Sequence, residues 1–145
     1  MDKVTIDTNL LVYAIDTADK NKHETVRTLL DSLVELDTVV SVQALAEFFH
    51  VVTRKGHLST EDARDRIEDW QALFPVIAVG PSTLAHAIDG LRRFQMPFWD
   101  AMLWATAQEA GVTVLLTEDF QDLRLIEGVR FVNPFRHDDL SEFLA

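Results

Sequence analysis

Four carboxylic acids stand where they could form one metal-binding site: Asp7, Glu47, Asp100 and Asp119. Asp7 and Asp119 each follow a hydrophobic segment typical of a strand, whereas Glu47 and Asp100 lie in segments with the spacing of helices. Carboxylates that face one crevice repel each other, so without a cation at least one would be protonated near neutral pH. Oxygen ligands without a histidine or cysteine partner suit hard cations. The pattern therefore predicts a site for Mg²⁺ or Mn²⁺.

Three of these acids also have a purely structural explanation. Asp7 and Asp100 stand where the N-cap residue of a helix would stand, and aspartate caps helices well. Glu47 could pair with Arg54 or another arginine, but Arg54 is seven residues further on and the surface between them is apolar. A buried carboxylate without a partner is costly, and we therefore favour a ligand role for Glu47.

The acids are distributed over a chain that alternates between short strands and helices. Apolar or β-branched segments predict five strands, at residues 3–6, 38–42, 76–79, 112–116 and 129–132. Helical spacing predicts helices after residue 7 and at residues 19–36, 43–55, 59–74, 81–96 and 98–110. This alternation predicts an α/β fold with a parallel sheet covered on both faces. In such sheets ligands bind at the carboxyl ends of strands, where Asp7 and Asp119 stand.

Two of the predicted helices carry further expectations. Residues 43–55 are apolar on most sides, which predicts a buried helix that ends before Gly56. The helix after Pro81 has an apolar face that we expect to be buried, formed by Leu84, Ala87, Ile88, Leu91 and Phe94.

The overall composition limits the class of protein. The chain has 145 residues, 48% of them hydrophobic, which favours one domain at residues 1–135 and an acidic tail at 136–145 that frays or docks as a small helix. There is no cysteine, no apolar run long enough to cross a membrane and no secretion signal, so a cytoplasmic location is expected. The net charge of −11 excludes a broad basic surface, so any nucleic acid would have to be held locally.

Four motifs resemble those of the PIN-domain nucleases, in the expected order and over residues 3–135. They are Asp7-Thr8-Asn9, the segment 41–47 with its acid in an apolar helix, the segment 97–101 leading into Ala105 and Ala107, and the segment 116–119. Length and spacing are similar to those of the VapC-like toxins of toxin–antitoxin pairs. The resemblance implies a three-layer α/β/α fold with a five-stranded parallel sheet of order 3-2-1-4-5.

The same resemblance assigns roles to individual residues. The family's metal ligands correspond to Asp7, Glu47, Asp100 and Asp119, and its polar helpers correspond to Asn9 and Thr117. Many relatives follow the last motif with an Asp-Phe pair, whereas Asp122 is followed here by Leu123, so Asp122 is a candidate substitute or helper for the last acid. The implied activity is that of a Mg²⁺- or Mn²⁺-dependent endoribonuclease that uses a metal-activated water and leaves a 5′-phosphate.

Partners are also implied by the resemblance. Relatives of this kind act on RNA, form homodimers and are held by an antitoxin protein, and no membrane contact is expected. The basic pairs Arg54-Lys55 and Arg92-Arg93 could hold RNA phosphates, although solvated helix surface is the simpler explanation of either pair. The alternative to a nuclease is a catalytically silent PIN-like scaffold that binds RNA or protein. Such a scaffold would be expected to have lost its acids, and all four are present.

Overall fold

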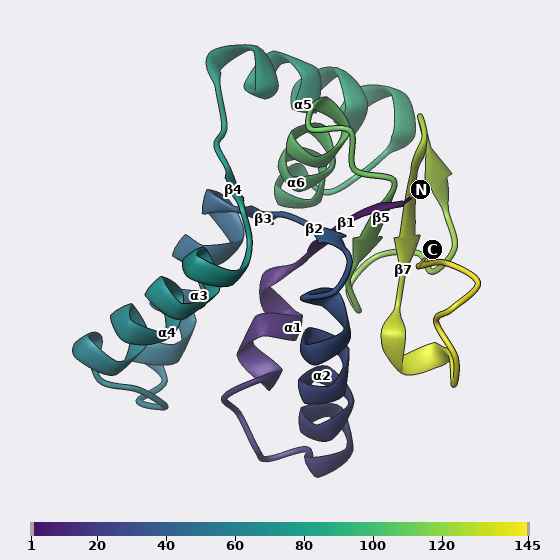
Figure 1. The fold of residues 1–145 in the computed structure, drawn as a ribbon. Coiled ribbons are helices and arrows are strands. Elements are labelled where there is room, and N and C mark those ends of the chain that lie inside the picture. Colours follow the sequence, from purple (N-terminus) through teal and green to yellow (C-terminus); the bar gives the residue numbers. More distant parts are fainter. Residues whose placement is uncertain (1, 145) are drawn as a thin grey trace.

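Short strands of buried aliphatic and β-branched residues form the centre of the fold. The computed structural model, which describes residues 2–144, shows these strands between two layers of helices (Figure 1). β1 (Lys3–Ile6) lies between β2 (Asp37–Thr38) and β5 (Val114–Leu116), and β7 (Val129–Val132) follows β5. These four strands are parallel. A short strand at the edge, β6 (Leu125–Ile126), is antiparallel to β7.

The predicted α/β class is confirmed, but the sheet is mostly and not entirely parallel, and the strand order differs slightly from the expected 3-2-1-4-5. The five-stranded sheet has the order β2-β1-β5-β7-β6. β6 was not predicted from the sequence. It forms a hairpin with β7 through Glu127 and Gly128, whose φ angles of 47° and 83° are those of a tight two-residue turn. A strand of two residues is too short to show a periodic pattern.

The strand expected at residues 38–42 is divided into two. The backbone amide of Val39 donates to Val4 of β1, whereas the amide of Val40 donates to Pro75. Because the chain changes its partner here, β3 (Val40–Ser41) and β4 (Val76–Ile77) form a separate two-stranded parallel sheet.

Helices cover both faces of the sheet. They are α1 (Thr8–Tyr13), α2 (Lys20–Leu33), α3 (Val42–Arg54), α4 (Thr60–Leu73), α5 (Pro81–Phe94) and α6 (Phe98–Glu109). The side chains of Asp19, Ser41 and Ser59 cap α2, α3 and α4 by accepting a hydrogen bond from a backbone amide of the first turn. Within the described residues, none of the helices is long and apolar enough to cross a membrane.

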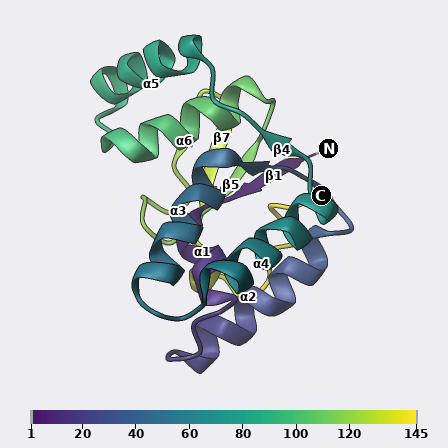
Figure 2. The ribbon, with the colours of Figure 1, turned by 90° about the vertical axis from the view of Figure 1, so that its left-hand side faces the viewer.

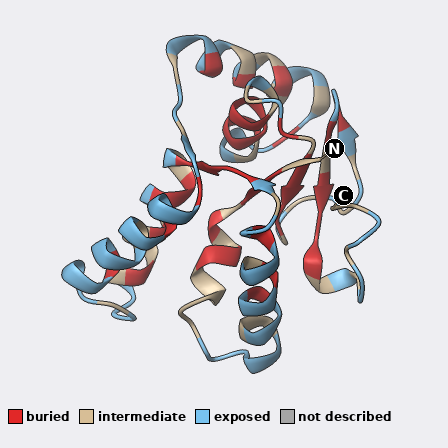
Figure 3. Ribbon diagram, viewed as in Figure 1, coloured by how far each residue is buried: buried red, intermediate tan, exposed pale blue. Residues whose placement is uncertain are grey.

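The alternation of side chains along the strands divides the core into two halves, one on each face of the sheet. Val114 and Leu116 of β5 belong to the half that contains residues of α1 to α4, whereas Leu115 belongs to the half that contains residues of α5 and α6. Figure 2 shows these two groups of helices on opposite sides of the sheet. In Figure 3 the buried residues follow the strands and the inner faces of the helices.

The expectation that α3 is buried all round was wrong. Phe48 and Val52 are buried against the first half of the core, but Ala46 and His50 on the other face are exposed. Only one face of α3 therefore contributes to the core, and the rest borders solvent or the cleft described below.

The expected apolar face of α5 is also only partly buried. α5 packs on α6, where Trp104 fills the contact and a Cβ added to Gly90 would lie 2.4 Å from Trp104 Cζ3. Ala87 is buried, but Leu84 and Ile88 are 45% and 52% exposed. The contact with α6 is therefore narrower than the apolar face that the sequence predicts.

The acidic C-terminal segment docks on the body of the protein, but not as an α-helix. A single 3₁₀ turn forms at Pro134–Arg136. Beyond it, Leu140, Phe143 and Leu144 pack against the first half of the core.

Candidate active site

The carboxyl ends of β1 and β5 form one edge of the sheet, and each strand leads directly into a segment with an acid. Ile6 and Leu116 are paired, and the Asp7 amide donates a 2.9 Å hydrogen bond to the Leu116 carbonyl. A cleft of about 440 Å³ lies at this edge. Its lining includes all four candidate acids, Asp7, Glu47, Asp100 and Asp119. Asp7 and Asp119 come from the strand ends, and α3 and α6 supply the other two.

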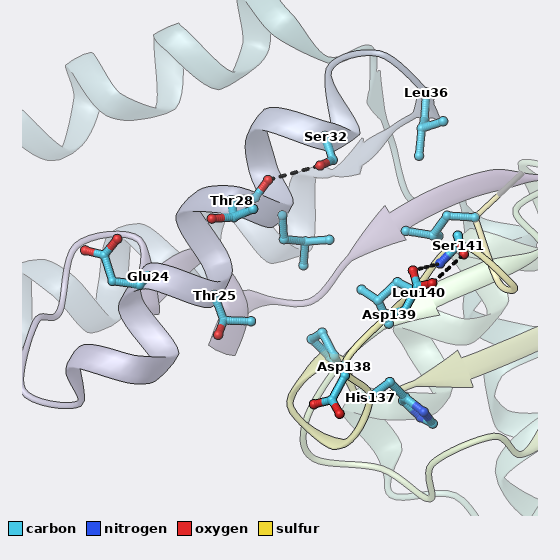
Figure 4. A pocket seen from close by; sticks show the side chains of 13 residues that line it. Glu24, Thr25, Thr28, Ser32, Leu36, His137, Asp138, Asp139, Leu140 and Ser141 are labelled. Carbon is cyan, nitrogen blue, oxygen red and sulfur yellow. Dashed lines mark hydrogen bonds between the residues drawn. The ribbon is translucent and has the colours of Figure 1, made fainter.

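A larger hollow, of about 620 Å³, lies between α2 and the C-terminal segment (Figure 4). Threonine and serine side chains of α2 face a segment that carries Asp138 and Asp139. Among the residues that the structure describes, none of the four candidate acids and no lysine or arginine lines this hollow. It therefore has neither the acid cluster nor a permanent positive charge for a phosphate, and the smaller cleft is the candidate active site.

Asp7 both caps a helix and faces the cleft. One carboxylate oxygen accepts a 2.7 Å hydrogen bond from the Thr8 amide at the start of α1, and the other accepts a 2.8 Å bond from the Thr117 hydroxyl. Burial raises the pKa of the Asp7 carboxyl from 3.8 to about 6, against the lowering effect of these two hydrogen bonds. The negative charges of Asp100 and Glu47 raise it further. The structural and functional explanations of Asp7 are thus compatible.

Glu47 is held by neutral groups. Gln43, one turn earlier on α3, donates a 3.0 Å hydrogen bond to it. The single Thr8 hydroxyl proton is shared between the Ala44 carbonyl at 3.1 Å and Glu47 at 3.4 Å. No ion pair between Glu47 and Arg54 is present within 4 Å in the described structure. The alternative explanation of Glu47 as the partner of Arg54 therefore has no support in this geometry.

Asp100 lies in the first turn of α6, but the N-cap position is occupied by Pro97. Its side chain has no hydrogen-bond partner among residues 2–144. Partial burial raises the pKa of the Asp100 carboxyl, and the charges of Asp119 and Glu47 add to this effect. The negative charges of the four acids therefore act on one another: Asp100 and Glu47 raise the pKa of Asp7, and Asp119 and Glu47 raise that of Asp100.

Asp119 is linked to Asp7 through two polar neighbours. The Asn9 side-chain amide donates 2.8 Å to the Asp119 carboxylate and 3.3 Å to the Thr117 hydroxyl oxygen. The Thr117 oxygen also accepts a 3.2 Å bond from the Asp119 backbone amide. The structure thus brings together both expected helpers, Asn9 and Thr117, between the first and the last acid.

Two buried oxygen atoms in the cleft have no hydrogen-bond partner within the described structure, Oδ1 of Asn9 and Oε1 of Gln43. Buried oxygens of this kind require a donor or a cation. Together with the carboxylates they form a set of hard oxygen ligands, which suits Mg²⁺ or Mn²⁺. No three acidic, histidine or cysteine side chains of residues 2–144 are already arranged around one point. The residues therefore fit a cation in their chemistry, and binding it requires the present side-chain hydrogen bonds to rearrange.

Asp122 is placed away from the acid cluster. Its carboxylate accepts a 2.8 Å hydrogen bond from the Asn133 amide and lies 2.8 Å from Nε2 of His137. These contacts attach the loop after β5 to the start of the C-terminal segment. Asp122 does not line the cleft.

Of the four basic residues expected to hold RNA, only one lines the cleft in the described structure. Lys55, at the end of α3, lines the cleft, whereas its exposed neighbour Arg54 does not. Arg92 and Arg93 on α5 also lie outside the cleft lining, and both pair with Asp89 at 3.4 and 3.3 Å.

Several residues of the cleft were missed by sequence reasoning. Gln43 is four residues before Glu47, and this spacing on a helix is a signal that could have identified it. Glu118, next to Asp119 in the chain, also lines the cleft. It accepts hydrogen bonds of 2.6 Å from the Tyr13 hydroxyl and 2.8 Å from Lys22, and the bond with Glu118 raises the pKa of Lys22 to about 12. No local pattern predicts this contact between distant segments.

The fold and the cleft define an α/β protein with a carboxylate cluster at the carboxyl edge of its sheet. The sequence matches the family model described as PIN domain over residues 4–127, and the chain belongs to this family. A sequence search among curated proteins found no significant match.

Solved structures share the fold at low sequence identity. The toxin VapC20 of Mycobacterium tuberculosis, described as cleaving the sarcin–ricin loop, is 19% identical, with 88% of this chain and 99% of that chain covered and a TM-score of 0.67. A toxin–antitoxin complex from Klebsiella pneumoniae is 17% identical, with 91% of this chain and 98% of that chain covered and a TM-score of 0.68. DNA-bound VapBC from Salmonella typhimurium is 23% identical, with 90% of this chain and 97% of that chain covered and a TM-score of 0.64. At these identities the similarity shows a common fold.

Proposed function

We propose that this protein is a Mg²⁺- or Mn²⁺-dependent endoribonuclease and acts as the toxin of a toxin–antitoxin pair. The observation that carries the proposal is the cleft at the ends of β1 and β5. Its lining includes the acids of all four PIN-like motifs, Asp7, Glu47, Asp100 and Asp119. Membership of the PIN family and the fold shared with VapC20 support the choice of RNA as substrate.

The four acids would hold the ion, and the oxygens of Asn9 and Gln43 without partners lie in the same cleft. When bound, Mg²⁺ or Mn²⁺ would supply an activated water and stabilise the charge that develops on the phosphate. Asp7 would have to be ionised for this role. Its pKa of about 6 means that near pH 6 a proton and the ion compete for the same carboxylate.

Neighbouring polar residues would hold the acids in position. Thr117 and Asn9 fix Asp7 and Asp119 relative to each other. Gln43 and Thr8 orient Glu47. Because these four residues are neutral, they place the carboxylates without cancelling the negative charge that attracts the cation.

A protein antitoxin is the second proposed partner. The structural relatives include toxin–antitoxin complexes, and the net charge of −11 favours a basic segment as the inhibitor. We propose a homodimer as the functional assembly, in line with the family resemblance.

The test is the cleavage of total RNA by purified protein with Mg²⁺ or Mn²⁺, compared with the same reaction in EDTA and with the Asp7→Asn variant. Discrete fragments with 5′-phosphate ends that disappear in both controls are expected. Cleavage that persists in EDTA and in Asp7→Asn would contradict the proposal. RNA or protein binding without any cleavage would instead favour a catalytically silent scaffold.

A further inference from the structure

Trp99 is an exposed aromatic residue beside the acid cleft. Its side chain is 62% exposed, whereas Trp70 and Trp104 are 5% and 1% exposed. A large apolar ring that is left in water next to a polar cleft indicates a contact surface more strongly than an isolated aliphatic residue does.

The position of Trp99 is fixed from two sides. It precedes Asp100 in the first turn of α6 and lines the same cleft as the four acids. Its carbonyl accepts a 3.3 Å hydrogen bond from Gln43, which also holds Glu47. Its ring makes an edge-to-face contact with Phe98 at 4.8 Å between centroids. The ring is therefore held at the border of the cleft, and most of its surface remains exposed to solvent.

The cleft follows one face of α3. Gln43, Glu47, Val51 and Lys55 are spaced by four residues, and all of them line it. With a rise of 1.5 Å per residue, the first and last of these positions lie about 18 Å apart along the helix. Trp99 contacts the amino end of this row and Lys55 stands at its carboxyl end, with Glu47 between them. Along this face of α3 the cleft therefore presents the Trp99 ring, then the Glu47 carboxylate and then the Lys55 ammonium group.

We propose that Trp99 stacks on an unpaired base of the bound RNA beside the scissile phosphate and so positions the strand for cleavage. This inference rests on the nuclease function proposed above. Aromatic side chains stack on any base that is not already stacked in a duplex, and a lysine nearby holds a phosphate without base preference. Trp99 would thus position the strand, and Lys55 would hold its backbone on the far side of the acids.

Tryptophan fluorescence gives a direct test, because Trp99 is the one solvent-exposed tryptophan of the three in the chain. The Asp7→Asn variant would be titrated with a single-stranded oligoribonucleotide and with a duplex of the same sequence. Only the single strand should quench the fluorescence, and Trp99→Phe in this background should remove the signal. Equal quenching by both, or none during measurable binding, would overturn the proposal.

Affinity and kinetics provide a second readout. Trp99→Ala should weaken single-strand binding about tenfold and raise KM, whereas Trp99→Phe should stay near the parent because it keeps a ring. Leu125→Ser is the matched control, since Leu125 is 55% exposed on the edge strand β6, outside the cleft lining. An unchanged affinity and KM in Trp99→Ala would refute the stacking role.

The exposed Trp99 ring could instead lie in an interface between two copies of the chain. Analytical ultracentrifugation, which measures the oligomeric state, tests this alternative. If Trp99→Ala leaves RNA binding unchanged but lowers self-association, the ring belongs to an interface between two copies and the proposal is wrong. If wild-type protein cleaves RNA while both Trp99 variants behave like it, only the stacking inference fails. If wild-type protein neither binds nor cleaves RNA, the proposed function fails as well.

Discussion

The Thr117 hydroxyl donates a 2.8 Å hydrogen bond to Asp7, and this bond joins the ends of two neighbouring strands that are 110 residues apart in the chain. The same oxygen accepts hydrogen bonds from Asn9 and from the Asp119 amide. Thr117, together with Asn9, thus links the first and the last acid of the cleft. The carboxylates are positioned by the pairing of β1 with β5 and not by flexible loops alone.

In the metal-free protein, Asp7→Asn should gain about 1 to 3 kcal/mol of stability relative to wild type between about pH 4 and 7. This gain adds to a pH-independent loss, because the Asn amide group replaces one of the two oxygens that accept hydrogen bonds from Thr8 and Thr117. The pKa of Asp7 is raised from 3.8 to about 6 on folding, so ionised Asp7 destabilises the folded state. Below about pH 4 the group is protonated in both states and the variant gains little. The gain should grow between about pH 4 and 6 and then remain constant, as measured by urea unfolding in EDTA.

Asp31→Asn is the control for this prediction, because Asp31 is an exposed acid on α2 without a hydrogen-bond or ion-pair partner among residues 2–144. Its stability difference from wild type should not change through the same pH window. A stability difference between Asp7→Asn and wild type that does not change between about pH 4 and 7 would show that ionisation of Asp7 does not destabilise the folded state.

Lys55→Glu should weaken RNA binding about tenfold. The slope of log affinity against log salt concentration should fall by about one, the value expected for the loss of one phosphate contact. Lys55 is the one lysine or arginine in the cleft lining, whereas Arg92 is 80% exposed and pairs with Asp89 on α5. Arg92→Glu is therefore the matched charge reversal, and its effect should be small. A larger loss in Arg92→Glu, measured by titration at several salt concentrations, would place the RNA path over α5.

Asp122→Ala should lower the unfolding free energy by about 1 to 3 kcal/mol and leave metal-dependent cleavage by the folded protein unchanged. The carboxylate of Asp122 satisfies the Asn133 amide and contacts His137, and it does not line the cleft. Thermal unfolding and the cleavage rate at saturating Mg²⁺ are the measurements. A weaker response to Mg²⁺ in this variant would instead make Asp122 a helper of Asp119.

Gly90→Ala should destabilise the protein by about 1 to 3 kcal/mol, because the added methyl group would lie 2.4 Å from Trp104 Cζ3. The sign is informative, since an alanine in place of glycine inside a helix otherwise stabilises it by about 1 kcal/mol. Ser82→Ala, at an exposed position in the same helix, should be nearly neutral. If chemical unfolding shows Gly90→Ala to be as stable as wild type or more stable, α5 and α6 can move apart at little cost to accommodate the methyl group.

The acids could be located from the sequence because two general rules converge on them. Parallel strands end at one edge of a sheet, so an acid directly after each strand must lie near that edge, as Asp7 and Asp119 do. Helical periodicity placed Glu47 and Asp100 on helices, and the caps at Asp19 and Ser59 began helices where expected.

Other features depend on contacts that no local pattern contains. The change of partner at Val39 divides a predicted strand because β4 competes with β1 for its backbone. Leu84 and Ile88 remain exposed, whereas Ala87 and Gly90 of the same helix are buried, and the apolar periodicity of the helix does not distinguish the two pairs. Glu118 belongs to the cleft because Tyr13 and Lys22, from distant parts of the chain, reach it.

The four acids are divided equally between two parts of the chain, on either side of the exposed segment between β4 and α5. Asp7 and Glu47 precede this segment, and Asp100 and Asp119 follow it. A chain interrupted at residues 78–79 would give two fragments, each with two of the four proposed metal ligands and with one of the two neighbouring strands β1 and β5. Neither fragment alone would hold the complete site, so its activity would report their reassociation, which makes this fold a candidate for a split-enzyme complementation system.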